Sequence, residues 1–172
     1  MERGTLIDHE GRPAVRFRRE FSQPVERVWA AITNPDDLAA WFPSKVSMES
    51  QAGGTIEFYG DPNQPETRSS GTILIYEPPT RLAFSWNASE LHFTIDATPD
   101  GCVLTLIDVL ESQDAAARNA AGWTLCLREL TRRMDGQETG GPHSDAAESW
   151  RQHYDDYVAA GMPSGAWIPS GA

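Results

Sequence analysis

The predicted strand Cys102–Leu110 carries an acid where an apolar side chain is expected. Side chains alternate between the two faces of a strand, so Leu104 and Leu106 share the inner face with Asp108. A carboxylate in an apolar interior either has a raised pKa or is bound by a partner. Asp108 is therefore a candidate for a proton-handling or ligand-anchoring acid inside a cavity. The alternative is a place at the rim of the sheet, where water, the backbone or Arg118 binds the carboxylate.

Three further side chains are candidates for the wall of such a cavity. Tyr76 shares a strand face with Thr72 and Leu74, and its hydroxyl would supply a second polar group. Trp86 lies near the end of another predicted strand, and Trp123 lies in a long helix. Indoles at such positions either line a pocket or fill the core. The predicted ligand-binding residues are therefore Tyr76, Trp86, Asp108 and Trp123, and no catalytic residue is assigned.

The remaining reactive residue types do not form a recognisable site. The four histidines, His9, His92, His143 and His153, are scattered, and no His/Cys/Asp cluster has metal-ligand spacing. There is no nucleophile elbow, phosphate loop or dinucleotide fingerprint. We therefore expect neither a metal nor a cofactor. The two cysteines read as small buried side chains in a reducing compartment.

Composition narrows the class of partner. The 172 residues carry a formal net charge of −11, whereas nucleic acids and anionic membranes attract basic surfaces. The N-terminal stretch has no apolar signal region, and no later run is long enough to span a bilayer. The sequence thus predicts a cytoplasmic protein that binds neither nucleic acid nor membrane.

The longest element predicted to position the candidate residues is a helix over 112–136. Apolar side chains recur at spacings of three and four, so they line one side of the helix. These residues are Ala116, Ala120, Trp123, Leu127, Leu130 and Met134. Ser112 is a suitable N-terminal cap and Gly136 a suitable C-terminal one. Such a helix needs an apolar surface to cover.

The rest of the chain supplies that surface as a sheet. A first strand is predicted over Ala14–Phe21, followed by two short helices that begin after Ser22 and at Asn34. Short strands then alternate with turns and one loop at 60–70, whereas residues 1–12 look loose. The predicted strands are Lys45–Glu49, Thr55–Tyr59, Gly71–Glu77, Arg81–Asn87, Leu91–Thr98 and Cys102–Leu110. An antiparallel sheet closed by one long helix is an α+β fold.

These segments resemble a known family. PVERVWAAITNPDDLAAWFP, GGTIEF, GTILIYEPPTRLAFSW and the Gly-Trp of the long helix occur in the order typical of the Hsp90-ATPase-activator-homologue-like (AHSA1-like) family. That family belongs to the START-like (SRPBCC) helix-grip superfamily. The resemblance implies a Bet v 1-like curved sheet wrapped on the long helix, with an apolar cavity between them. Ala116, Ala120 and Gly122 are small enough to leave room along that seam.

We divide the chain into a START-like domain, 1–136, and a C-terminal extension, 137–172. The extension is predicted to hold one amphipathic helix over 145–160, followed by a coil in which Trp167 and Ile168 add contacts. The apolar side of this helix would comprise Ala147, Trp150, Tyr154, Tyr157 and Val158. It packs on its own domain, forms a homodimer interface, or covers the mouth of the cavity.

Three functions follow from these patterns and from the resemblance. The first is a binding protein for a small apolar molecule held between the sheet and the long helix. The second is a cyclase- or dehydratase-like enzyme that uses Asp108 and Tyr76 in that cavity. The third is an Hsp90-interacting, co-chaperone-like protein, as the family name suggests.

Overall fold

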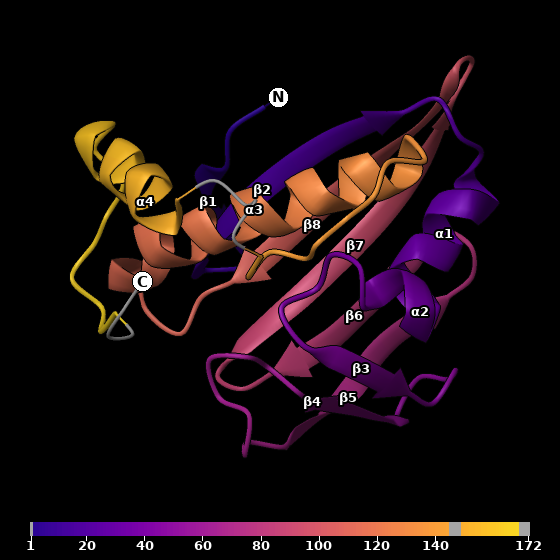
Figure 1. Cartoon of the computed structure of the whole chain (residues 1–172), viewed down its shortest axis with the longest axis horizontal. Coiled ribbons are helices and arrows are strands. Elements are labelled where there is room, and N and C mark those ends of the chain that lie inside the picture. Colours follow the sequence, from indigo (N-terminus) through magenta and orange to yellow (C-terminus); the bar gives the residue numbers. More distant parts are fainter. Residues whose placement is uncertain (1, 145–148, 169–172) are drawn as a thin grey trace.

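The computed structural model describes residues 2–144 and 149–168 and confirms an α+β, helix-grip architecture (Figure 1). Its strands form one antiparallel sheet in the order β1-β2-β8-β7-β6-β5-β4-β3. The strands are β1 Thr5–His9, β2 Arg12–Phe21, β3 Lys45–Met48, β4 Thr55–Tyr59, β5 Ser69–Glu77, β6 Arg81–Trp86, β7 Ser89–Thr98 and β8 Gly101–Val109. The helices are α1 Val25–Thr33, α2 Pro35–Leu38, α3 Ala116–Met134 and α4 Trp150–Ala159, and a 3-10 turn, Gln113–Ala115, precedes α3.

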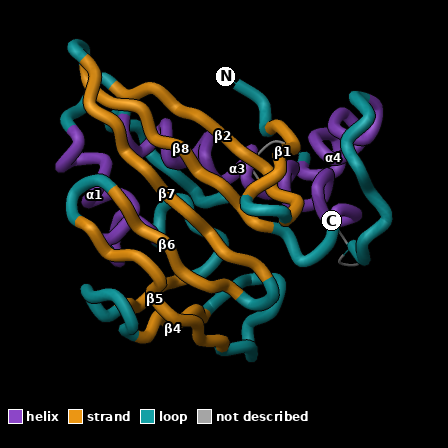
Figure 2. Tube along the Cα trace, turned by 180° about the vertical axis from the view of Figure 1, so that it is seen from behind, coloured by secondary structure: helices purple, strands orange, loops and turns teal. Residues whose placement is uncertain are grey.

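The long helix α3 lies along one face of the curved sheet, with α1 and α2 beside it (Figure 1). The opposite face of the sheet carries no helix in the view from behind (Figure 2). This arrangement follows from the alternation of apolar residues, because the inward side chains of β2, β6, β7 and β8 are buried. They include Val15, Phe17, Leu82, Phe84, Leu91, Phe93, Leu104 and Leu106. The inner face assigned from the sequence to Leu104 and Leu106 is thus confirmed.

The start of the chain is ordered, contrary to the expectation of a loose segment. Residues Thr5–His9 form the edge strand β1, which pairs with β2 so that Leu6 lies opposite Val15. The turn between them uses Glu10 and Gly11, both at positive φ. Leu6 is partly exposed, so this strand buries little apolar surface and its pattern in the sequence is weak.

The ends and the seam of α3 differ in detail from expectation. Gly136 has φ 73°, as a helix-ending glycine should. Ser112 makes no capping hydrogen bond through its side chain, since the 3-10 turn intervenes. Ala116 and Ala120 are buried against the sheet, but Gly122 is not on that side: a Cβ there would lie 4.0 Å from the indole nitrogen of Trp150. Gly122 follows Ala120 by two residues, over which the helix turns by about 200°, so the two residues face nearly opposite sides.

The extension helix α4 packs against the N-terminal half of α3 in its own chain (Figures 1 and 2). Tyr157 is the buried residue of α4; its hydroxyl accepts from the backbone N–H of Gly4 at 2.9 Å and lies 2.9 Å from Thr124 Oγ1. Trp150 and Tyr154 stack on each other with ring centroids 5.1 Å apart. Val158 is exposed, and Ala147 lies outside the described residues.

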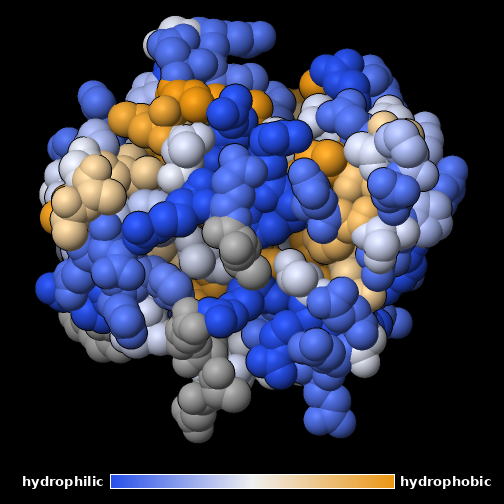
Figure 3. Space-filling model, turned by 90° about the horizontal axis from the view of Figure 1, so that it is seen from above, coloured by the Kyte–Doolittle hydropathy of each residue, from blue (hydrophilic) through white to orange (hydrophobic). Residues whose placement is uncertain are grey.

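Hydrophilic residues cover most of the face seen in Figure 3. Seen from above, hydrophobic residues appear in separate patches between hydrophilic ones (Figure 3). Within 2–144 and 149–168, no helix has the length and apolar character that crossing a membrane requires.

Removing the Leu127 side chain should be costly, because it is fully buried where α3 meets the sheet. We expect Leu127→Ala to lower the free energy of unfolding by about 2–5 kcal/mol. Leu74→Ala, the same change at a side chain 43% exposed on β5, should cost less than about 1 kcal/mol. Urea unfolding of both variants tests this; equal losses would show that the α3 face is wrongly assigned.

Tyr157→Phe tests whether the extension is anchored by one hydroxyl. Thr124 already donates to the carbonyl of Ala120, so the tyrosine O–H donates to Thr124 while accepting from Gly4. Its loss leaves a buried N–H unpaired, and we expect a cost of about 1–3 kcal/mol. The hydroxyl of Tyr154 has no hydrogen bond within the described residues, so Tyr154→Phe is the matched control. If the two variants melt alike, the hydroxyl does not hold α4 in place.

Candidate functional site

Asp108 is fully buried at the point where β8 passes under the start of α3. Its Oδ2 accepts hydrogen bonds from Trp123 Nε1 and from Asn119 Nδ2, each at 2.9 Å. Its Oδ1 is also buried and has no hydrogen-bond partner in the described part of the chain. The predicted inward direction is confirmed, and the alternative of a carboxylate at a wet rim is wrong. Helix α3 covers this acid with the side chains of Asn119 and Trp123.

Burial governs the ionisation of Asp108. Removal from water raises its pKa to about 6, although the donors on Asn119 and Trp123 and the charge of Arg118 act in the opposite direction. The group thus changes charge in a mildly acidic range, far above a free aspartate. A raised pKa of this kind is common both in buried structural acids and in acid–base sites.

Trp123 and Trp86 are brought together with Asp108. Trp123 is buried and meets Trp86 edge to face, with ring centroids 5.7 Å apart. The ring centroid of Phe42 lies 5.4 Å from that of Trp86 and 5.8 Å from that of Trp123. Phe58 packs on both Trp86 and Phe42, with ring centroids 6.1 and 6.0 Å apart. The two tryptophans therefore belong to an aromatic cluster that fills much of the space between the sheet and α3.

Tyr76 lies elsewhere. Ile73 points inward, whereas Thr72 and Leu74 are exposed, and a bulge between Ile73 and Ile75 then resets the alternation. Tyr76 is consequently half-buried, with its ring 5.5 Å from that of Trp29, which is itself half-buried. Three strand spacings, about 14 Å in total, separate β5 from β8. Tyr76 and Asp108 do not form one site.

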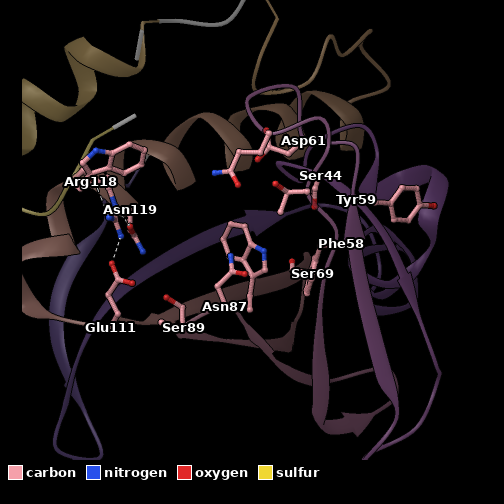
Figure 4. Close-up of a pocket in the computed structure, with 15 residues that line it drawn as sticks. Ser44, Phe58, Tyr59, Asp61, Ser69, Asn87, Ser89, Glu111, Arg118 and Asn119 are labelled. Atoms are coloured by element: carbon pink, nitrogen blue, oxygen red, sulfur yellow. Dashed lines mark hydrogen bonds and ion pairs between the residues drawn. The ribbon is translucent and has the colours of Figure 1, made fainter. Parts of the chain in front are cut away.

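A pocket of about 380 Å³ opens beside the aromatic cluster (Figure 4). Its walls come from the ends of β4 and β5, the β6–β7 turn, the start of α3 and the extension. The lining residues are Ser44, Phe58, Tyr59, Asp61, Gln64, Thr67, Ser69, Trp86, Asn87, Ala88, Ser89, Glu111, Arg118, Asn119 and Trp167. Of the four predicted binding residues, only Trp86 lines this pocket. Trp123 and Asp108 lie behind Asn119, which separates them from it.

One wall of the pocket is a fixed polar network. Arg118 donates from Nε to Asn119 Oδ1 at 3.0 Å, from Nη2 to Glu111 Oε1 at 2.6 Å, and from Nη1 to the carbonyl of Trp167 at 3.2 Å. Asn119 in turn donates to Asp108. The amide of Asn119 is therefore oriented from both ends, and the charge of Arg118 is paired.

The opposite wall comes from Ser44 and the loop after β4 (Figure 4). His143 holds this loop: its Nε2 bonds the carbonyl of Pro43 at 2.9 Å, and its Nδ1 bonds Asn63 Nδ2 at 3.2 Å. Asp61 lies 3.8 Å from the same imidazole. The loop-wall residues and Trp167 were missed from the sequence because they carry no periodic pattern.

Other reactive groups offer little chemistry. No group of three His, Cys, Asp or Glu side chains suited to a metal occurs within the described ranges. Both cysteines are free and buried, and burial raises the pKa of the Cys126 thiol. A thiol kept protonated in this way is a poor nucleophile.

A family model matches most of the chain. The sequence profile described as Activator of Hsp90 ATPase homolog 1-like protein matches residues 22–135, which is more than half of the chain. The chain belongs to this family. The matched segment contains the aromatic cluster, Asp108 and most of the pocket, whereas β1, β2 and α4 lie outside it.

Solved structures show that the fold is shared. CalU16 from Micromonospora echinospora is 25% identical, with a TM-score of 0.72 over 92% of this chain and 90% of CalU16. The protein EF2215 from Enterococcus faecalis, titled a conserved protein of unknown function, is 18% identical, with a TM-score of 0.72 over 91% and 89% of the two chains. An AHSA1-like protein from Aeromonas hydrophila is 21% identical and covers 72% of this chain and 92% of its own, with a TM-score of 0.61. A comparison with curated proteins gives no match.

The first two structures also share part of the extension. Residues 1–136 are 136 of 172, or about 79% of the chain, so matches over 92% and 91% must continue beyond Gly136. The match to the Aeromonas protein covers 72% of this chain, which residues 1–136 alone could supply.

The buried acid predicts a specific pH dependence of stability. The folded chain holds the Asp108 proton up to about pH 6, whereas an unfolded aspartate releases it near pH 4, so the fold loses stability as pH rises from about 4 to about 6. Asp108→Asn keeps both acceptor bonds without a charge. We expect it to gain stability relative to wild type as pH rises from 4 to 7, by about 3 kcal/mol.

Urea unfolding at pH 4 and pH 7 measures this difference. Asp96→Asn, at an exposed position on β7, is the control and should show no comparable gain. A difference between Asp108→Asn and wild type that stays constant with pH would contradict the burial of an ionising acid.

Proposed function

We propose that this protein binds a small, largely apolar molecule in the pocket beside the aromatic cluster. The observation that carries the proposal is the pocket itself: about 380 Å³ with Trp86 and Phe58 among its lining side chains and hydrogen-bonding groups around them. That volume lies in the range of small-molecule sites, which combine apolar walls with a few fixed polar groups. Family membership supports a ligand-binding role but does not identify the ligand.

The arrangement favours binding over catalysis. Asn119 and Trp123 occupy one oxygen of Asp108, and the acid does not line the pocket. Arg118 is neutralised by Glu111 and held by three acceptors, so it is a rigid binding group. A wall of fixed, paired groups such as Arg118 and Asn119 can recognise a molecule without moving protons.

The enzyme alternative retains one supporting observation, the raised pKa of Asp108. Tyr76 would not contribute, because it lies three strands away. A reaction would have to reach Asp108 through Asn119. Loss of turnover in Asp108→Asn with ligand affinity unchanged would support this alternative.

The co-chaperone alternative rests on the family name. A change in the ATPase rate of Hsp90 on addition of this protein would support it, and an unchanged rate would remove it. The homodimer through the extension and the domain boundary at residue 136 also remain predictions, although α4 uses its buried tyrosine within its own chain.

The binding proposal is tested by filling the pocket. Ser69 lines it, whereas Ser70, its neighbour on the same strand, is exposed. We expect native mass spectrometry after incubation with cell extract to detect a bound small molecule on wild type and on Ser70→Trp. Ser69→Trp should lose at least about 10-fold in occupancy, since the indole would occupy most of the site. Equal occupancy in both variants would place the ligand elsewhere and refute the proposal.

A further inference from the structure

The segment after α4 is fixed beside the pocket by its backbone. The N–H of Ala117 donates to the carbonyl of Pro163 at 3.0 Å, and the N–H of Ala166 donates to the carbonyl of Asp114 at 3.3 Å. The guanidinium of Arg118 donates to the carbonyl of Trp167 at 3.2 Å. These bonds hold the backbone at Trp167 against the start of α3.

The side chain of Trp167 is nevertheless 71% exposed. The other five tryptophans of the chain are buried or pack partly against the core, namely Trp29, Trp41, Trp86, Trp123 and Trp150. An indole can bury 150–250 Å², so leaving one in water forgoes a large hydrophobic gain. Here it is left at a pocket wall, where a bound molecule could cover it.

The polar groups of the pocket indicate what kind of molecule fits. Ser44 is only 8% exposed, and its hydroxyl has no hydrogen-bond partner within residues 2–144 and 149–168. A buried unpaired hydroxyl is costly, and a ligand hydroxyl or carbonyl would satisfy it. The cation Arg118 is already paired, and the remaining polar side chains are mostly uncharged amides and hydroxyls. An uncharged ligand with one or two oxygen groups matches this lining.

We propose that the pocket takes a flat, uncharged aromatic molecule bearing a hydroxyl or carbonyl group, and that Trp167 supplies one of the faces on which it stacks. Trp86, which is half-buried, supplies further ring surface, and Ser44 bonds the oxygen group. This inference rests on the proposed binding function and adds the ligand class and the role of the extension. It makes the C-terminal segment part of the binding site.

Two probes with the same carbon skeleton and the same hydroxyl group separate stacking from simple apolar burial. 2-Naphthol is flat and uncharged at pH 7, and decahydro-2-naphthol is its saturated, non-planar analogue. Calorimetric titration should show that Trp167→Ala weakens 2-naphthol at least about 10-fold, since a stacked pair adds to the area term, while decahydro-2-naphthol weakens by less than about 3-fold. Trp167→Phe should recover most of the affinity. Because the indole is exposed, the melting temperatures of these variants should match wild type.

A second pair of probes tests the hydroxyl. Ser44→Ala should weaken 2-naphthol but leave naphthalene unchanged, since only the former can bond Ser44 Oγ. If both naphthols bind wild type and Trp167→Ala equally, the stacking role is overturned while pocket binding stands. If neither binds but Ser69→Trp still loses the molecule taken from cell extract, the ligand class is wrong and the binding function survives. If Ser69→Trp loses nothing, both proposals fall.

Discussion

The packing of the alanine-rich start of α3 on the sheet is the constraint on which the rest depends. Ala116, Ala117, Ala120 and Ala121 are all buried. Ala116 and Ala120 lie on the sheet side, where their small size lets the helix lie low and seal Asp108 from water, whereas Ala117 and Ala121 lie on the side of Thr124, toward α4. The acid must then find donors inside the protein, and Trp123 and Asn119 supply them. Larger residues at these positions would lift the helix and open the interior that the aromatic cluster now fills.

Much of the fold could be predicted from the sequence, because burial of one face of a strand or helix produces a periodic pattern of apolar residues. The inward residues of β6, β7 and β8, including Asp108, follow from strict alternation, and the buried side of α3 follows from its three-and-four spacing. The wrong predictions concern segments in which that pattern is interrupted or absent. Alternation predicts one inner face for Thr72, Leu74 and Tyr76, but the bulge in β5 leaves Thr72 and Leu74 exposed while Tyr76 packs partly against the core, and no propensity marks the bulge. The strand β1 was missed because an edge strand buries too few side chains to leave a pattern.

The pocket was less predictable than the fold. Its lining comes from segments far apart in the chain, such as the loop after β4 and the extension, and their meeting depends on tertiary contacts of residues like His143 and Arg118. The candidate Trp86 was found because it ends a regular strand. Trp167 was predicted to add contacts, but its carbonyl makes the hydrogen bond and its ring stays in water. Sequence patterns report which residues are buried, whereas a binding site uses residues that are not.

Asn119 links the buried acid to the pocket and explains how one stretch of α3 serves both. Its Nδ2 donates to Asp108 and its Oδ1 accepts from Arg118, so the amide cannot rotate without breaking a bond at each end. Arg118 is in turn held by Glu111 and by the carbonyl of Trp167. The polar wall of the pocket is therefore ordered before any molecule arrives, which lowers the entropy lost on binding. On this argument the carboxylate at position 108 fixes the geometry of the wall, in spite of the stability that its burial costs.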